Sequence, residues 1–189
     1  RKQVTDGLVT EFDKNLPFEL TNGQIEIGEA LFAEIGQTHP MHRLLQGDVG
    51  SGKTIVALRA MLAAVDAGGQ AALLAPTEVL AGQHLRTIKK LMGALATKGE
   101  LGGSELGTQV ELLTGSVTGA NRSNVLANIA NGVAGIVVGT HAIIQEGVKF
   151  KDLALVVVDE QHRFGVEQRA ALAAKSPGDK RPHVLVMTA

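Results

Sequence analysis

Two short segments of the chain carry residue types that could bind and cleave a nucleoside triphosphate. The first fits the pattern G-x-x-x-x-G-K-[ST] and consists of Gly47, Asp48, Val49, Gly50, Ser51, Gly52, Lys53 and Thr54. Glycines let backbone amides approach phosphates closely, the lysine adds a positive charge for the β- and γ-phosphates, and the threonine hydroxyl is a ligand for Mg²⁺. A chance match in a glycine-rich chain is the alternative, but a strand before the loop and a buried helix after it disfavour chance. We therefore predict an ATP-binding loop.

The second segment is acidic and follows the apolar run 153–158. A carboxylate at the end of a buried strand lies at the carboxyl edge of the sheet, where α/β proteins bind ligands. We predict that Asp159 holds Mg²⁺ and that Glu160 orients or deprotonates the attacking water, since a base must lie within hydrogen-bonding reach of that water. A strand ending in a solvated acidic turn is the alternative. His162, two residues after Glu160, could connect the hydrolysis site to a neighbouring segment or be structural.

Strands and helices must alternate to position these segments. Helices are expected at about 21–37, 53–67, 77–95 and 120–131, and strands near 44–45 and at 71–75, 110–113, 136–138, 155–158 and 184–187. The strands are continuous apolar runs, which is typical of a parallel sheet covered by helices on both faces. We interpret residues 1–20 as a polar linker from an upstream region, 21–189 as the ATP-binding lobe and 97–109 as a surface loop.

Composition limits the other possible functions. A length of 189 residues favours one domain. The net charge of −1 and the absence of Trp and Tyr argue against a polybasic nucleic-acid binder and against base stacking, so any contact with DNA should involve phosphates. Cysteine is absent, which excludes disulfides and thiolate metal sites and fits a reducing compartment. His39 and His42 have no evident third ligand for a metal site.

The acidic segment Asp159-Glu160-Gln161-His162 resembles the DExH box of superfamily 2 helicases. Longer blocks look like the RecG family of bacterial branched-DNA helicases, and they occur in the order of that family from about Leu16 to the end of the chain. These blocks are residues 45–54, 75–84, 113–116, 138–145, 159–169 and 186–189. The coupling factor of transcription and repair is the nearest alternative. Ser51 and Gln161 favour the RecG family over it.

The resemblance implies a P-loop NTPase fold of the RecA-like type, an α/β/α sandwich of three layers with a mostly parallel sheet. It also implies ATP and Mg²⁺ as cofactors and branched DNA, at stalled forks and Holliday junctions, as the partner. A monomer in the bacterial cytoplasm is expected. Thr188 matches a motif that couples hydrolysis to DNA movement, and the chain stops inside that motif. We therefore expect a second lobe with an arginine finger, and an upstream junction-binding domain. A P-loop switch without nucleic acid is the alternative from another functional class.

The chain before the phosphate loop contains two residues that match the segment that contacts adenine in related helicases. Phe18 belongs to this segment, and the resemblance implies that Gln24 reads the adenine edge. Thr21 and Gln24 also have the spacing of a capping box, which explains the same residues without a nucleotide. Both interpretations of Gln24 remain open at this point.

Four residues match motifs that line the DNA track in this superfamily. Hydroxyl groups and amides at helix starts bind phosphate without reading sequence, which agrees with such a role. N-capping is the alternative, above all for a threonine that begins a helix. The residues implied in DNA binding are Thr77, Ser116, Thr140 and His141.

Overall fold

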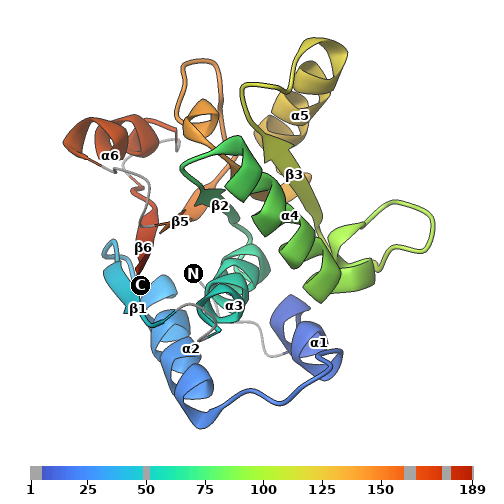
Figure 1. The fold of residues 1–189 in the computed structure, drawn as a ribbon, viewed down its shortest axis with the longest axis vertical. Helices are drawn as coiled ribbons and strands as arrows, with labels where there is room; N and C mark the ends of the chain where they lie inside the picture. Colours follow the sequence, from blue (N-terminus) through green and yellow to red (C-terminus); the bar gives the residue numbers. More distant parts are fainter. Residues whose placement is uncertain (1–5, 49–51, 160–164, 176–179, 189) are drawn as a thin grey trace.

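The computed structural model describes residues 6–48, 52–159, 165–175 and 180–188. Its centre is a six-stranded sheet in which all strand pairs are parallel, with the order β1-β6-β5-β2-β4-β3 (Figure 1). The strands are β1 (His42–Gln46), β2 (Gln70–Leu74), β3 (Gln109–Leu113), β4 (Ala134–Gly139), β5 (Leu153–Asp159) and β6 (His183–Thr188). The α-helices are α1 (Leu8–Lys14), α2 (Asn22–Ile35), α3 (Lys53–Asp66), α4 (Glu78–Met92), α5 (Gly119–Asn131) and α6 (Val166–Ala173).

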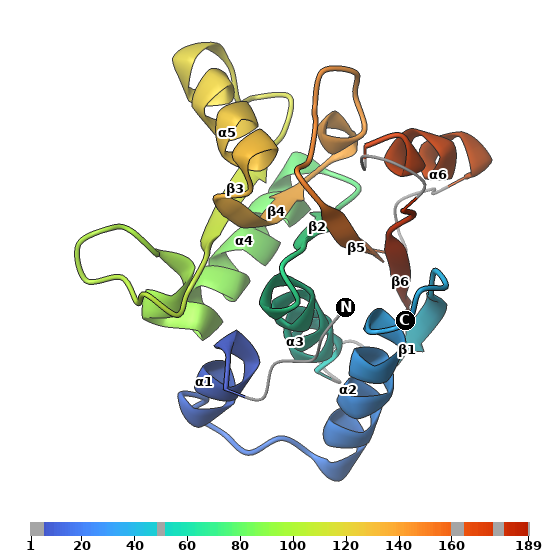
Figure 2. The same cartoon turned by 180° about the vertical axis from the view of Figure 1, so that it is seen from behind.

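Alternate side chains of the buried strands point into two separate hydrophobic cores. Leu73 and Val157 pack in one core with residues from α1, α2, α3 and α4. Leu74 and Val156 pack in the other core with residues from α5 and α6. This alternation follows from the two-residue period of a strand. The expected three-layer α/β/α sandwich is therefore confirmed. In both views α6 lies near β6 and α5 near β3, at different places along the sheet (Figures 1 and 2).

The predicted elements are largely observed, with shifted ends and some additions. The predicted helix 77–95 divides into α4 and the 3-10 helix η1 (Gly93–Ala96). Helix α6 and the 3-10 helix η2 (His141–Ile143) had not been predicted. The glycine-rich loop after η1 is closed at its base by an antiparallel bridge between Thr97 and Gln109. None of the helices within the described ranges is long and apolar enough to cross a membrane.

The interpretation of residues 1–20 as a linker is wrong for α1. Leu8 and Phe12 are fully buried and belong to the same core as α3. Their spacing places both on one side of a helical turn, where α3 covers them. The polar residues between them hid this pattern, because seven residues give too short a window for a periodicity signal.

Side chains of α3 hold both ends of α1. At the N-terminus, the Asp66 carboxylate accepts hydrogen bonds from the backbone amides of Leu8 at 2.7 Å and Val9 at 3.1 Å. These amides have no partner inside the helix, and a negative charge is favourable there. Near the C-terminus, Arg59 donates from Nε and Nη2 to the two oxygens of Asp13 at 3.0 and 2.9 Å. Helix α1 is therefore an integral part of the fold.

Candidate nucleotide site and DNA-facing edge

The two predicted segments meet at the carboxyl edge of the sheet. Strand β6 lies between β1 and β5, with Gln46 paired to Thr188 and Asp159 paired to Met187. Three adjacent strands therefore end at one level and deliver the start of the phosphate loop, Thr188 and Asp159 to the same place. Helix α3 starts at this edge and packs over β5 and β2, so its positive N-terminal end faces the same region.

The phosphate loop is described at Gly47, Asp48 and from Gly52 onward; Val49, Gly50 and Ser51 lie outside the described residues. Gly52 is the N-cap of α3 and has a φ of +83°, in the left-handed region that only glycine adopts without strain. A Cβ atom on Gly52 would also overlap Nε2 of Gln24. Both the conformation and the close approach explain why glycine stands at this position.

Lys53 lies partly buried at the first position of α3. Its ammonium group donates to the Gly47 carbonyl and, at 2.9 Å, to the Thr188 carbonyl. The Gly47 amide donates to the same Thr188 carbonyl at 3.2 Å. Lysine has three N–H donors, so these two contacts hold the ammonium group at the sheet edge and leave one donor for an anion. Thr54 follows in the first turn and is also partly buried.

Asp159 ends β5 with its side chain 20% exposed. Its Oδ2 atom lies 3.0 Å from Nε2 of His84, a residue of α4. The histidine donates this hydrogen bond to the carboxylate when Nε2 carries the ring proton. The sequence did not indicate His84, because 75 residues separate the pair. The predicted residues Glu160, Gln161 and His162 lie outside the described residues.

Gln24 forms the predicted capping box at the start of α2. The Thr21 amide donates to Gln24 Oε1 at 2.9 Å, and the Gln24 amide donates to Thr21 Oγ1 at 3.2 Å. The capping interpretation is therefore confirmed. The other end of the Gln24 amide, Nε2, lies against Gly52 of the phosphate loop. One side chain thus connects α2 to the loop, while its contact with adenine remains a prediction.

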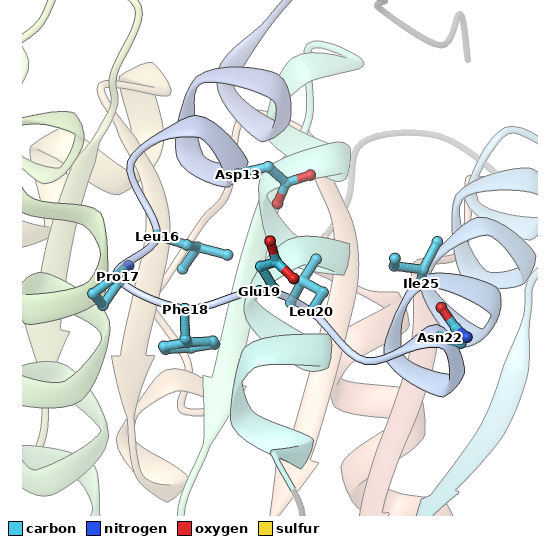
Figure 3. A pocket seen from close by; sticks show the side chains of 8 residues that line it. All are labelled: Asp13, Leu16, Pro17, Phe18, Glu19, Leu20, Asn22 and Ile25. Atoms are coloured by element: carbon cyan, nitrogen blue, oxygen red, sulfur yellow. The ribbon is translucent and has the colours of Figure 1, made fainter.

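Phe18 lines a surface hollow of about 640 Å³ beside α1 and α2. Phe18 is 48% exposed, whereas Leu16 and Leu20 of the same loop pack against the core. Figure 3 shows the loop from Leu16 to Leu20 running between Asp13 of α1 and Ile25 of α2.

The four residues implied in DNA binding follow the remaining strands at the same edge. Strands β2, β4 and β3 are adjacent, and Thr77, Thr140 and Ser116 come within three residues of their ends. His141 follows Thr140 and is exposed. The structure therefore brings these residues to the edge that also carries Lys53. Their contact with DNA stays a prediction.

The side chains of these residues have local partners. Thr77 Oγ1 accepts from the Leu80 amide at 3.2 Å, and Thr140 Oγ1 accepts from the Ala142 amide at 3.5 Å, so both are N-caps. Ser116 donates its amide and its hydroxyl to the carboxylate of Glu78, the first residue of α4. Glu78 lies in the sequence block 75–84 that resembles the RecG family, but only the fold reveals its partner 38 residues away.

Comparison with known proteins identifies the class of this lobe. The DEAD/DEAH box helicase family matches residues 26–189. The chain belongs to this family, and membership implies ATP binding.

Within the class, the chain is similar to RecG helicases. It is 59% identical to the ATP-dependent DNA helicase RecG of Mycobacterium tuberculosis H37Rv, over 98% of this chain and 25% of the relative. It is 45% identical to RecG of Bacillus subtilis 168, over 100% of this chain and 26% of the relative. A solved structure of RecG bound to a three-way DNA junction matches with a TM-score of 0.81 and 40% identity, over 99% of this chain and 23% of that one. The chain spans about a quarter of the length of these relatives, and the RecG resemblance is confirmed.

Proposed function

We propose that the chain is the ATP-binding motor lobe of a RecG-like DNA helicase. In this proposal, ATP hydrolysis drives remodelling of branched DNA such as stalled replication forks and Holliday junctions. The observation that supports it is the shared carboxyl edge of the sheet. The residues proposed to bind the nucleotide follow β1, β6 and β5, and those proposed to bind DNA follow β2, β4 and β3. A motor needs both ligands on one rigid element, and this edge offers that arrangement.

The nucleotide half would work as follows. Lys53 turns an N–H from the carbonyls of Gly47 and Thr188 toward the β- and γ-phosphates, and loop amides from Gly47 to Gly52 bind the phosphate oxygens. The hydroxyl of Thr54 and the carboxylate of Asp159 are the hard oxygen ligands that Mg²⁺ prefers, so the donor set fits this ion. The bound ion would neutralise developing phosphate charge. Glu160 would act on the attacking water, and His162 would connect the hydrolysis site to a neighbouring segment.

The base of ATP would lie near the hollow lined by Phe18. An exposed aromatic ring is suited to stack on a purine, and the hollow borders the first turn of α2. Gln24 uses Oε1 for its cap, so we propose that Nε2 is the atom that contacts the nucleotide. This assignment lets one side chain cap its helix and sense the nucleotide.

The DNA half would bind the phosphate backbone. A capping hydroxyl accepts a hydrogen bond through oxygen and keeps its own proton, so Thr77 and Thr140 can donate to phosphate while they cap. The exposed ring of His141 would add a further contact. Ser116 directs both donors to Glu78, so it would contact DNA only when this pair opens.

Other partners follow from the same proposal. A second RecA-like lobe would supply an arginine finger, and an upstream domain would bind the junction, with the whole acting as a monomer. We propose that the lobe itself includes α1, because residues 8–14 share the core of α3.

The test uses the full-length protein with Lys53→Ala. We expect loss of ATP-driven unwinding of a synthetic fork, because the substitution removes the charge at the phosphates. Lys98→Ala is the matched control, since Lys98 is an exposed lysine outside the nucleotide site. Unwinding that survives Lys53→Ala would contradict the proposal. ATPase activity that branched DNA does not change would instead indicate a P-loop switch. Displacement of stalled RNA polymerase by the full-length protein would favour the coupling factor.

A further inference from the structure

The hydrogen bond between His84 and Asp159 lies at the proposed nucleotide site, and His84 has no part in the proposed binding of ATP. His84 of α4 and Asp159 of β5 are joined through Nε2 and Oδ2 at 3.0 Å. Both side chains are largely shielded, with exposed fractions of 16% and 20%. A contact in such surroundings is screened less by water than a surface pair. It therefore constrains the carboxylate more strongly than a surface contact would.

The position of His84 in the fold makes this constraint specific. Asp159 is the last residue of its strand, and its backbone pairs with Met187 of β6. Helix α4 packs on β3 and β4, and it presents His84 across the sheet edge to the end of β5. The histidine ring is rigid, so a fixed helix and a hydrogen bond together set the direction in which the carboxylate points.

We propose that His84 is a positioning residue for the Mg²⁺-binding carboxylate of Asp159. This inference rests on the proposed function, because it needs Asp159 to be a magnesium ligand. Groups that orient metal-binding carboxylates set the affinity for the metal, and their loss costs about 10–100-fold. His84 would thus determine how much Mg²⁺ strengthens ATP binding, without touching ATP itself.

The experiment measures binding of a fluorescent ATP analogue to the full-length protein, once in EDTA and once across a Mg²⁺ titration. The variants are His84→Ala, His84→Gln, which keeps a terminal N–H donor, and Thr87→Ala, an exposed position on the same helix. Melting temperatures are recorded for all of them. This readout is binding rather than turnover, so it separates positioning of the metal from every later step.

The inference predicts a selective loss. In His84→Ala, the gain in analogue affinity caused by Mg²⁺ falls about tenfold, whereas affinity in EDTA stays at the wild-type value. His84→Gln recovers most of the gain, and Thr87→Ala keeps all of it. Three results would overturn the inference: a wild-type gain in His84→Ala, an equal loss in EDTA, or no recovery in a stably folded His84→Gln. Absence of any Mg²⁺-dependent binding in the wild-type protein would instead refute the proposed function.

Discussion

Replacement of Arg59 by alanine should weaken the packing of α1 on the rest of the lobe. The Arg59 side chain is only 7% exposed and donates to both oxygens of Asp13 in α1. Its guanidinium also lies 5.2 Å from the ring centre of Phe32 in α2. Gly28 of α2 leaves room for it, because a Cβ atom there would overlap Nη1. Arg59 therefore joins three helices, and its ionic contact is with α1.

The size of the effect follows from burial. Removing one member of a fully buried ion pair costs about 3–5 kcal/mol. Asp13 keeps 33% of its side chain exposed, so water would solvate much of the charge left behind. Arg59 Nη1 has no hydrogen-bond partner among the described residues, a defect of about 1–3 kcal/mol that the substitution removes. We therefore expect the free energy of opening of α1 to fall by about 2 kcal/mol, which makes the open form about thirtyfold more populated.

Amide hydrogen exchange measures this opening locally. The amides of α1 should exchange about thirtyfold faster in Arg59→Ala, whereas amides of β2 and β5 should keep their rates. A double-mutant cycle with Asp13→Asn should return most of the effect as coupling energy. Arg43→Ala is the control, because its pair with Glu34 is exposed to water and should contribute little to stability. Wild-type exchange of α1, or a coupling energy near zero, would refute this reasoning.

Two further substitutions test the sheet edge. Gly52→Ala should weaken binding of an ATP analogue about tenfold or more, because alanine is strained at a φ of +83° and its methyl group would displace Gln24. Equilibrium binding of the analogue measures this loss, and an affinity equal to that of the wild-type protein would contradict it. Glu78→Gln keeps an acceptor for Ser116 but removes a negative charge near the proposed DNA track. The affinity for a DNA fork should therefore rise about two- to threefold at low salt, and this gain should shrink at high salt. Fluorescence anisotropy across a salt series measures the affinity, and a gain that is independent of salt would count against the placement of DNA.

The sequence predicted the elements whose chemistry is local. Gly52 and Lys53 belong to one short motif, and Thr21 and Gln24 to another, so spacing alone identifies the loop and the cap. The apolar runs 71–75 and 155–158 predict parallel strands, because a strand buried on both faces has no polar alternation. In each case the interacting residues lie within a few positions of one another, which is the range over which sequence patterns are informative.

The contacts that the sequence missed join distant segments. Helix α1 depends on Asp66 and Arg59, which lie on another helix about fifty residues away. The pair of His84 with Asp159 depends on the strand order, which places β2 beside β5. The sequence around a lone histidine, or around a polar segment of seven residues, does not indicate that either one has a distant partner. Such contacts follow only once the topology is known.

Helix α4 is the element that connects the two halves of the sheet edge. Glu78 at its start contacts Ser116 on the proposed DNA side, and His84 contacts Asp159 on the proposed nucleotide side. Six residues of helix span about 9 Å, and a helical segment of this length does not bend without proline or a similar break. We therefore expect a shift of the Glu78 end to displace His84 as well, and with it the carboxylate of Asp159. Because the apolar face of α4 packs on β3 and β4, we expect any such shift to move the helix as one body.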